Sequence, residues 1–465
     1  PIRNYHNGPT GMIFNPGTAL GKKWLNKFFL VEFVGTATNS HIWSFDLKPK
    51  GASFDFKSEV DVVSGILPTG IRFGPEGALY AADWVTGWDI KNYGRVWKLD
   101  VDQKSNDLEA ERAKTKAYIQ MDYSKAGVPQ LASLLAYEDM RVRQKAQFEL
   151  VARGQAAELW KAIAQKDNQF ARVHGIWGIG QLAAKNQSIA SNLVAYLSDS
   201  DLEIQAQVLK VIGDVRYKGA EKELIAALGS SSARVQFFAA QALGRTEAAS
   251  AIPGLLKLIE QNKDEDVYIR HAAVLALSRI GQVEPMAALA TSTNRSLRIA
   301  AVLVLRRLSS PEVARFLTDS DMYIVAEAAR AIHDDLSIPA ALPALAATLA
   351  NRSITSEVII RRAINACLRV GTSKEIDLLV AYVQRTDIPD AMRAEAIATL
   401  GTWGDPSVLD RVDGRHRGKL DRNAQDVVAK VQPIIPAFIH SKNIEVLNAT
   451  GQLVGELGIK DVAAE

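Results

Sequence analysis

The stretch that decides most of the fold is EDMRVRQKAQFELVARG, which runs from residue 138 to residue 154. Its apolar residues Val142, Ala146 and Leu150 recur every four positions. Residues four apart lie on the same side of an α-helix, because one turn takes 3.6 residues. The stretch therefore predicts a helix that buries one side against a neighbouring element.

The same pattern returns along the chain after residue 127. An aliphatic residue is usually followed by a polar residue or arginine, with a small or apolar residue four positions on and an aliphatic residue eight positions on. The pattern starts at Val142, Ala171, Ile204, Val235, Ile269, Leu297, Ile324, Ile360 and Met392. The mean spacing of about 31 residues is typical of stacked helix pairs. We therefore expect an all-α solenoid, an armadillo-type superhelix, over residues 127–406.

Residues 1–103 follow a different pattern, with β-branched and aromatic residues in short runs between Gly, Pro and Asn. Three segments occur twice: GPTGMIF (8–14) matches LPTGIRF (67–73), NKFFLVEF (26–33) matches GALYAADW (77–84), and HIWSFDL (41–47) matches RVWKLD (95–100). A strand-rich unit that repeats at about 59 residues predicts blades of a β-propeller. Because two blades cannot close a ring, we expect the last two blades of a propeller whose earlier blades lie upstream of Pro1.

The rest of the chain completes the expected domain organisation. Residues 104–126 are rich in charge, which predicts a solvated linker between the two modules. Residues 407–465 begin with a loop-like insertion that contains DGRHRGKLDRN (413–423), and the helical pattern then resumes weakly at Val446. We expect this last segment to be a further, truncated repeat, so that the chain is a fragment at both ends.

Composition excludes several classes of function. The 465 residues carry 55 Lys and Arg against 52 Asp and Glu, and a net charge of +3 gives no electrostatic footprint for nucleic acid. The single cysteine, Cys367, excludes an intrachain disulfide and a cluster of thiolate metal ligands, and its apolar setting predicts a buried, inert thiol. No apolar run reaches the roughly 18 residues that a membrane-spanning helix needs.

Two of the helical segments also resemble a known family. The repeats are similar to HEAT repeats of the phycobilisome-lyase type. EDMRVRQKAQFELVARG (138–154) and ARVHGIWGIGQL (171–182) resemble the HEAT segment of the membrane-bound dehydrogenase family of planctomycetes, verrucomicrobia and Bacteroidetes. In that family a propeller of the glucose/sorbosone dehydrogenase type precedes the HEAT repeats, and a cytochrome c domain often follows. The stretch from Pro68 to Leu99 looks like the last blade of such a propeller.

The resemblance implies a function that these residues do not show by themselves. It implies a periplasmic or secreted quinoprotein that oxidises a sugar or alcohol, with pyrroloquinoline quinone and calcium as cofactors and catalytic residues upstream of Pro1. The HEAT repeats would orient the propeller or dock an electron acceptor such as a cytochrome c. The family's quinone-pairing arginines correspond here to Leu67 and Thr69, which puts quinone binding in that mode in doubt.

Three residues at strand ends are candidates for cofactor or metal binding. Thr69 opens one predicted strand and Asp83 closes the next, and their counterparts in the first repeat are Thr10 and Glu32. Thr69 and Asp83 are candidate cofactor contacts, and the carboxylates of Glu32 and Asp83 are candidate calcium ligands because calcium prefers hard oxygen donors. The alternative is that both carboxylates accept hydrogen bonds in turns at the strand ends.

The aromatic residues and the histidines are weaker candidates. Trp43, Trp84, Trp88 and Trp97 could stack on a sugar ring, but packing between sheets is the more common role of such residues. His6 precedes the first repeated segment. His174, His271 and His333 stand singly on predicted helices, without a second ligand at metal spacing, which favours a place in the core or on the surface.

Recurrent arginines follow the first aliphatic residue of the helical pattern. They are Arg143, Arg172, Arg270, Arg298, Arg361 and Arg393. An arginine at one position of every repeat more often pairs with an aspartate or a backbone carbonyl group of the adjacent repeat than with a ligand. The glycines of GIWGIGQL (175–182) lie within a predicted helix and favour close helix packing over phosphate binding.

Two other functions stay open beside the dehydrogenase. The first is a non-catalytic scaffold, because solenoids present extended concave surfaces to protein partners. The second is a metal-dependent, lactonase-like propeller that uses Glu32 and Asp83. Quinone binding would favour the dehydrogenase, and calcium dependence without redox activity would favour the lactonase.

Overall fold

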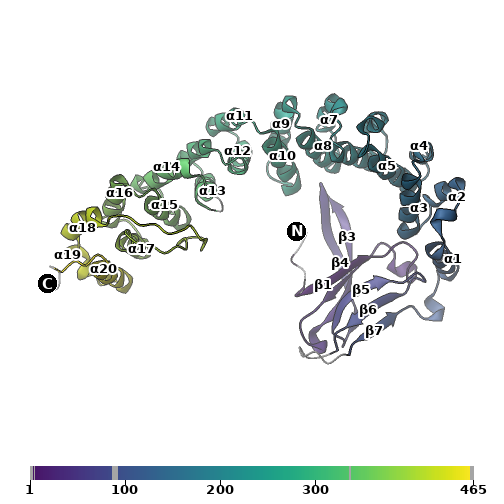
Figure 1. The fold of residues 1–465 in the computed structure, drawn as a ribbon, viewed down its shortest axis with the longest axis horizontal. Helices are drawn as coiled ribbons and strands as arrows, with labels where there is room; N and C mark the ends of the chain where they lie inside the picture. The colour runs from purple at the N-terminus through teal and green to yellow at the C-terminus, as the bar shows by residue number, and fades with distance from the viewer. Residues whose placement is uncertain (1–3, 5, 86–92, 335–336, 461–465) are drawn as a thin grey trace. The chain divides into compact units, whose positions relative to one another are not determined.

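The computed structural model describes residues 4, 6–85, 93–334 and 337–460. The chain forms two compact units: unit 1 comprises Pro1–Leu258 and Asp266–Ala276, and unit 2 comprises Ile259–Glu265 and Leu277–Glu465. Unit 1 holds two β-sheets and the first helices of the solenoid, and unit 2 holds the remaining helices (Figure 1). Among the described residues, no helix combines the length and the apolar character that crossing a membrane requires.

The two sheets are simple antiparallel meanders. The first contains β1 (Pro9–Phe14), β2 (Phe28–Glu32), β3 (His41–Lys50) and β4 (Ser53–Ser64) in sequence order. The second contains β5 (Pro68–Phe73), β6 (Leu79–Asp83) and β7 (Arg95–Leu99), also in sequence order. Each strand therefore pairs with the strand that follows it, which is the commonest arrangement for strands joined by short turns.

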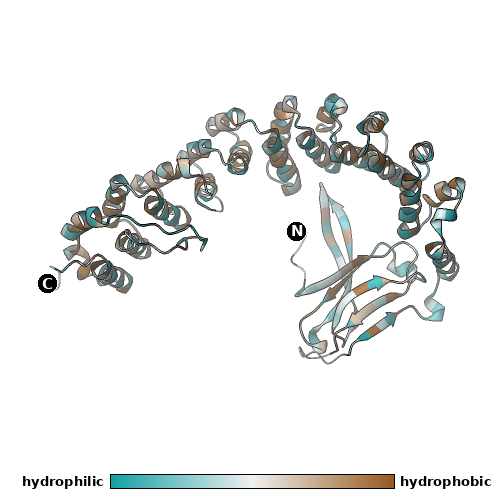
Figure 2. Ribbon diagram, viewed as in Figure 1, coloured by the Kyte–Doolittle hydropathy of each residue, from teal (hydrophilic) through white to brown (hydrophobic). Residues whose placement is uncertain are grey.

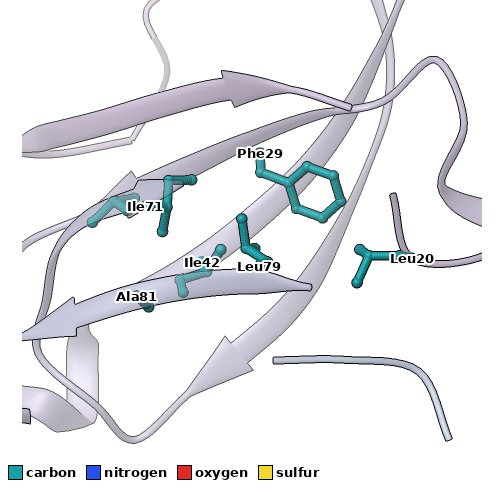
Figure 3. Packing of buried hydrophobic residues seen from close by; sticks show 7 residues of the cluster. Leu20, Phe29, Ile42, Ile71, Leu79 and Ala81 are labelled. Atoms are coloured by element: carbon teal, nitrogen blue, oxygen red, sulfur yellow. The ribbon is translucent and has the colours of Figure 1, made fainter. Parts of the chain in front are cut away.

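A shared hydrophobic core joins the two sheets. Phe29, Val31 and Ile42 of the first sheet pack with Ile71, Leu79 and Ala81 of the second, and Leu20 closes one end (Figure 3). Leu20 comes from the loop between β1 and β2. The backbone N–H of Leu20 donates to the carbonyl oxygen of Gly77 at 2.8 Å. One face of each sheet is thereby removed from water. This burial stabilises both sheets, because a sheet of three or four strands needs an apolar face covered by another element.

The internal repeat predicted from the sequence is present in the geometry of the strands. Pro9 pairs with Glu32 and Pro68 pairs with Asp83, and in both sheets the register shifts at the following threonine. The two PTG segments also meet in space, because a Cβ atom on Gly11 would lie 3.2 Å from the Cα atom of Gly70.

The propeller prediction, however, was wrong. Within the described residues the strands form only two small antiparallel sheets, of four and three strands, and no ring of sheets closes. The repeat identified equivalent strands correctly, but a repeat does not determine how sheets assemble. The assembly depends on which apolar faces meet, and here the face with Val31 and the face with Ile71 bury each other.

The helices of the solenoid follow in pairs. In unit 1 they are α1 (Glu109–Gln120), α2 (Val128–Leu134), α3 (Met140–Ala152), α4 (Ala156–Ile163), α5 (Gln169–Ala183), α6 (Leu202–Asp214), α7 (Glu221–Ala227) and α8 (Ala233–Thr246), and α9 (Ile252–Asn262) and α10 (Val267–Ile280) cross the unit boundary. Within unit 1, α3, α5 and α8 lie on the side of the sheets and α4 and α7 lie on the outer side (Figure 1).

Unit 2 continues the same architecture. It contains α11 (Glu284–Ala287), α12 (Arg295–Arg307), α13 (Met322–His333), α14 (Leu342–Ala347), α15 (Glu357–Val370), α16 (Ser373–Val383), α17 (Asp390–Gly401), α18 (Gln425–Val431), α19 (Pro436–Ile439) and α20 (Ile444–Glu456). Figure 2 shows both hydrophobic and hydrophilic segments along the helices, as expected for helices that bury one side. The insertion before α18 has one isolated β-bridge, between Leu409 and His416.

The periodic residues of the sequence pattern form the core of the solenoid. Val142, Ala146 and Leu150 of α3 are fully buried, and so are Val235, Ala239 and Leu243 of α8. The helices begin at side-chain caps: Asp139, Asp201 and Asp321 each accept a hydrogen bond from a backbone N–H in the first helical turn. The periodic apolar residues and the aspartate caps together explain where these helices begin.

The segment between sheets and solenoid is more ordered than a charged linker suggests. It contains α1, whose Arg112 is only 7% exposed. The Arg112 guanidinium donates to the carbonyl oxygen of Glu76 at 2.8 Å and to both carboxylate oxygens of Asp100 at 2.8 Å. Arg141 at the start of α3 donates to the carbonyl oxygen of Gly74 at 2.7 Å, so helices and sheets are joined within unit 1.

Candidate interaction surface

A hollow of about 460 Å³ opens between helices α3, α5 and α6 of unit 1. It is lined by residues of three successive helices: Gln144, Gln147 and Phe148 of α3, Trp177, Gly180 and Gln181 of α5, and Lys210, Val211 and Asp214 of α6. These residues recur at three- and four-residue spacing, so each helix presents one stripe of side chains to the hollow. The volume lies in the range of sites that bind small molecules or side chains.

Hydrogen bonds between neighbouring repeats fix the side chains of this surface. His174 Nδ1 lies 2.7 Å from Gln147 Oε1, and Gln147 Nε2 donates to Gln181 Oε1 at 2.9 Å. The amide oxygen of Gln147 can only accept, so Nδ1 of His174 carries the proton. Burial lowers the pKa of His174 to about 3, with a contribution from the nearby Arg143, and the imidazole is therefore neutral.

A second chain of hydrogen bonds runs beside the first. Trp177 Nε1 donates to Gln207 Oε1 at 2.9 Å, and Gln207 Nε2 donates to Glu203 Oε1 at 2.6 Å. Arg234 of α8 then donates to Glu203 Oε2 at 2.7 Å. The indole, the amides and the guanidinium are each oriented by a partner in an adjacent repeat, which makes the surface pre-organised.

Two cations and one carboxylate lie at the edge of the hollow. Lys210 Nζ donates to Asp214 Oδ2 at 2.7 Å, and Arg245 of α8 contacts the other carboxylate oxygen of Asp214. The walls of the hollow are otherwise neutral amides, aromatic rings and aliphatic groups. With two cations against one carboxylate, the edge of the hollow carries a net positive charge.

The predicted strand-end residues lie at equivalent positions, and their oxygens are engaged. Glu32 accepts hydrogen bonds from Trp43 Nε1 at 2.8 Å and from the backbone N–H of Asn7 at 3.2 Å. Asp83 accepts from Trp97 Nε1 at 2.9 Å. It also accepts from the backbone N–H groups of Leu67 at 3.0 Å and Val85 at 2.8 Å.

These contacts do not fit a calcium site. Burial raises the pKa of Glu32 and of Asp83, but the donated hydrogen bonds, led by those of the two tryptophans, outweigh burial and leave both values below normal. Each carboxylate oxygen already faces an N–H donor, and a cation would have to displace those donors. Thr69, the candidate cofactor contact, directs its hydroxyl to the carbonyl oxygen of Ala82 at 3.4 Å. The alternative of turn hydrogen bonds at strand ends accounts for the geometry.

The tryptophans of the sheets divide between packing and exposure. Trp43 stacks on the His6 ring with centroids 4.3 Å apart, and His6 lies 3.4 Å from Glu32. Trp84 and Trp97 are 43% and 38% exposed. Trp88 lies outside the described residues. His6, Trp43 and Glu32 thus form one structural cluster beside β2.

Four of the recurrent arginines pair within the array. The contacts to aspartates of the adjacent repeat are as predicted, but the contacts to carbonyl groups lie within the arginine's own helix pair. Arg143 donates to the carbonyl oxygen of Tyr137 at 2.6 Å, and Arg393 donates to that of Val383 at 3.1 Å. Arg172 donates to the carbonyl oxygen of Ile163 and to Asp199, and Arg298 donates to that of Ser292 and to Asp319. The guanidinium groups neutralise helix ends and turn carboxylates of the array itself.

A buried polar cluster in unit 2 was missed by sequence reasoning. The His333 side chain is fully buried, with Nδ1 3.0 Å from Asp334 and Nε2 2.8 Å from Asn365 and 3.5 Å from Asp410. Arg362 donates to both oxygens of Asp334 at 2.8 Å, and Arg417 donates to Asp410 at 3.1 Å. His333, Asp334 and Asp413 have metal-compatible spacing, but arginines already pair their carboxylates, so the cluster anchors the insertion to α13 and α15.

Comparison with known proteins identifies part of the solenoid. A family described as HEAT repeats matches residues 190–267, 221–290 and 252–321. These residues are therefore HEAT repeats, as predicted, while the phycobilisome-lyase type of repeat stays a prediction. No curated protein matches the chain.

Three solved structures illustrate the fold neighbours. An engineered protein has 18% identity and a TM-score of 0.34, over 73% of this chain and 99% of that chain. Importin beta crystallised in ammonium sulfate has 11% identity and a TM-score of 0.43, over 76% of this chain and 55% of that chain. Yeast importin-beta has 13% identity and a TM-score of 0.40, over 77% and 56%.

Proposed function

We propose that this chain is a protein-binding scaffold whose contact surface is the row of helices α3, α5, α6 and α8. The observation that carries the proposal is the pre-organised stripe of amide and aromatic side chains around the hollow of about 460 Å³. A HEAT array exposes such a surface over several repeats, and a rigid surface of this kind loses little entropy when a partner binds.

The chemistry of the surface supports a macromolecular partner. Phe148 is 53% exposed at the rim, and Trp177 forms a wall of the hollow. Aromatic side chains are enriched where proteins bind each other, because they bury a large area with few rotatable bonds. The stripe continues to Arg234 and Phe238 of α8, where the guanidinium lies 5.1 Å from the ring centroid.

The dehydrogenase function rests on the sequence resemblance alone. Oxidation of a sugar or alcohol, pyrroloquinoline quinone, a cytochrome c partner and a periplasmic or secreted location all remain predictions from that resemblance. No contact among the described residues favours them over a scaffold. A lactonase-like role would need Glu32 and Asp83 as cation ligands, and both already accept N–H donors.

The scaffold is tested by locating the surface that a partner contacts. Affinity capture from the source organism supplies candidates, and each is purified and titrated against this chain by isothermal calorimetry. Ala184 is an exposed alanine that lines the hollow, and Ala226 is an exposed alanine on the outer helix α7. We expect Ala184→Arg to weaken binding by about tenfold or more and Ala226→Arg to leave it unchanged.

Two results would contradict the proposal. One is that no captured protein binds the purified chain directly. The other is that Ala226→Arg abolishes binding while Ala184→Arg does not, which would move the contact to the outer helices.

A further inference from the structure

We propose that α20 (Ile444–Glu456) binds α20 of a second copy of this chain, through a side of the helix that the rest of unit 2 leaves open. This contact lies within unit 2 and is independent of the scaffold function, whose surface is on α3, α5, α6 and α8. Two observations carry it: an apolar side of α20 that is open to solvent, and two residues by which this side differs from the same side of other helices in the array.

One side of α20 carries an apolar stripe that is open to solvent. The stripe consists of Ile444, Leu447, Gly451 and Val454, which recur every three or four residues and therefore share one side of the helix. Ile444 is 64% exposed, and nothing lies within 4 Å of the position that a Cβ atom on Gly451 would take. The opposite side of α20 packs on α17, where a Cβ atom on Gly401 would lie 3.0 Å from the Cα atom of Leu453 (Figure 1).

A hollow of about 400 Å³ opens beside the stripe. It is lined by Leu447, Thr450, Gly451 and Val454 of α20 and by Ile439, Ile459 and Lys460 next to the helix. Gly451 contributes no side chain to the floor, and Lys460 is the one charged residue among the described residues that line the hollow. An aliphatic side chain that entered it would exchange contact with water for contact with apolar groups.

In the array, the corresponding side of a helix is covered by the next helix. Gly451 and Val454 stand five and eight positions after Val446, which opens the repeat pattern in α20. In α6, α8 and α17 the residues at these two positions are at most 3% exposed; they are Leu209, Ile212, Ala240, Leu243, Ile397 and Leu400. The open side of α20 is thus continuous with the surface through which the helices pack on each other, which favours a helix as its occupant.

Two residues set this side of α20 apart from the array. At the position after the opening aliphatic residue, α6, α8 and α17 carry Gln205, Gln236 and Arg393, whereas α20 carries Leu447. Four positions later the same three helices carry an apolar side chain, whereas α20 carries Gly451. An occupant that fits must therefore bring a protruding apolar side chain to fill the space above the glycine, because protein interfaces pack without voids.

The same helix supplies the protruding side chain. Ile444 stands about two turns before Gly451 on the same side of α20. In an antiparallel pair of α20 helices with a two-fold axis near Leu447, Ile444 of each copy lies over Gly451 of the other. The stripe has no charged residue, so like charges do not oppose each other across the axis. A two-fold contact of this kind is closed and gives a dimer instead of a filament.

Sedimentation equilibrium of the full chain tests for the dimer. We expect the 50.7 kDa monomer to associate reversibly between about 1 and 200 μM, because one helix from each copy makes a small interface. Ile444→Ser removes the side chain that fills the hollow and should raise the Kd of the dimer by about tenfold or more. Leu202→Ser is the matched control, because Leu202 is likewise the first residue of its helix and is 44% exposed, and it should leave the Kd unchanged.

Exchanging the two contact residues tests the geometry of the pair. Gly451→Ile closes the hollow and Ile444→Gly removes the protruding side chain, so each single variant should weaken the dimer by about tenfold or more. In Ile444→Gly/Gly451→Ile each copy again offers one protruding side chain and one gap, and this double variant should dimerise more tightly than either single variant. Circular dichroism melting curves check that every variant is folded.

Three outcomes would overturn the inference. They are a chain that stays monomeric at every concentration, a dimer that Leu202→Ser weakens as much as Ile444→Ser does, and a double variant that dimerises no more tightly than the single variants. A chain that stays monomeric would mean that another element, from this protein or from a different partner, covers the stripe.

Discussion

The backbone N–H of Ala52 donates to Oδ2 of Asp266 at 2.7 Å, and so the tip of the β3–β4 hairpin is tied to the start of α10. Asp266 also caps that helix, because its Oδ1 accepts from the backbone N–H of Tyr268 at 2.8 Å. Gly51 makes the approach possible: its φ is +54°, and a Cβ atom there would lie 2.2 Å from Asp266 Oδ2. One carboxylate thus serves a strand turn and a helix end within unit 1.

Alanine at Gly51 should release the hairpin tip. The substitution adds the strain of a left-handed backbone, roughly 1–2 kcal/mol, and a clash with Asp266. Gly65→Ala is the control, because Gly65 also has a positive φ, of +79°, but nothing lies within 4 Å of its Cβ position. Hydrogen exchange should rise at residues 47–56 in Gly51→Ala and stay unchanged there in Gly65→Ala. Equal exchange in the two variants would show that Asp266 does not hold the tip.

Glycines where helices cross should not tolerate a methyl group. A Cβ atom on Gly213 of α6 would lie 2.8 Å from the Cα atom of Ala242, and one on Gly244 of α8 would lie 2.6 Å from that of Ala276. A backbone atom of the neighbouring helix cannot move aside as a flexible side chain can. Each alanine variant should therefore lose about 1–3 kcal/mol of stability. Gly451 of α20 has open space around it, and Gly451→Ala should instead gain up to about 1 kcal/mol from helix propensity. Calorimetric melting temperatures measure both effects, and a lowered value for Gly451→Ala would contradict the argument.

Much of the fold could be predicted from local patterns. The helix-forming residues of the repeats, such as Val142 and Leu150, are fully buried, and the cap residues stand where the helices begin. The strand repeat placed Glu32 and Asp83 at equivalent positions, and each accepts a hydrogen bond from a tryptophan on the next strand. These features follow from periods of two and 3.6 residues, which depend on neighbours in sequence.

The assembly of the sheets and the candidate surface could not be predicted in that way. The propeller prediction failed because repeated strands do not specify how many sheets pack together or through which faces. Gln144 and Gln181 have the spacing of an ordinary solvated helix face, and only the stacking of α3 on α5 brings them to one hollow. His333 and Asp410 lie 77 residues apart in sequence and meet through the insertion, so no local pattern pairs them.

His174 should make stability depend on pH in the weakly acidic range. Burial and the nearby Arg143 lower the pKa of His174 from 6.5 to about 3, so between these values the unfolded chain binds a proton that the folded chain does not. Unfolding free energy should therefore fall as pH decreases from 6.5 towards 3, by about 1 kcal/mol for each pH unit. Urea titrations measure the slope, which His174→Gln should reduce. The same substitution at the exposed His271 should leave the slope unchanged, and a reduction there as well would contradict the assignment.

The Asp410 carboxylate should anchor the insertion of unit 2. Its side chain is 1% exposed and pairs with Arg417, while Asp377 is 64% exposed and pairs with Lys430. Removing one partner of a buried pair typically costs about 3–5 kcal/mol, whereas an exposed pair contributes less than about 1 kcal/mol. We therefore expect Asp410→Asn to lower the stability of the chain strongly and Asp377→Asn to change it little. Limited proteolysis within residues 407–424 and urea unfolding would measure the difference, and equal effects would rule out an anchoring role.

The same carboxylate should make unit 2 sensitive to strong acid. Burial raises the pKa of Asp410, but backbone hydrogen bonds, His333 and Arg417 outweigh burial and hold it below its normal 3.8. Burial raises the pKa of Asp334 as well, but hydrogen bonds and charge from His333 and Arg362 together outweigh burial and lower it. A lowered folded-state pKa contributes stability that is complete above the unfolded value and is lost as pH falls through the folded one. Hydrogen exchange in α13 and in the insertion should therefore stay slow at pH 5 and accelerate below about pH 4. In Asp410→Asn the acceleration should be smaller, and an unchanged acid response in that variant would mean that other groups control it.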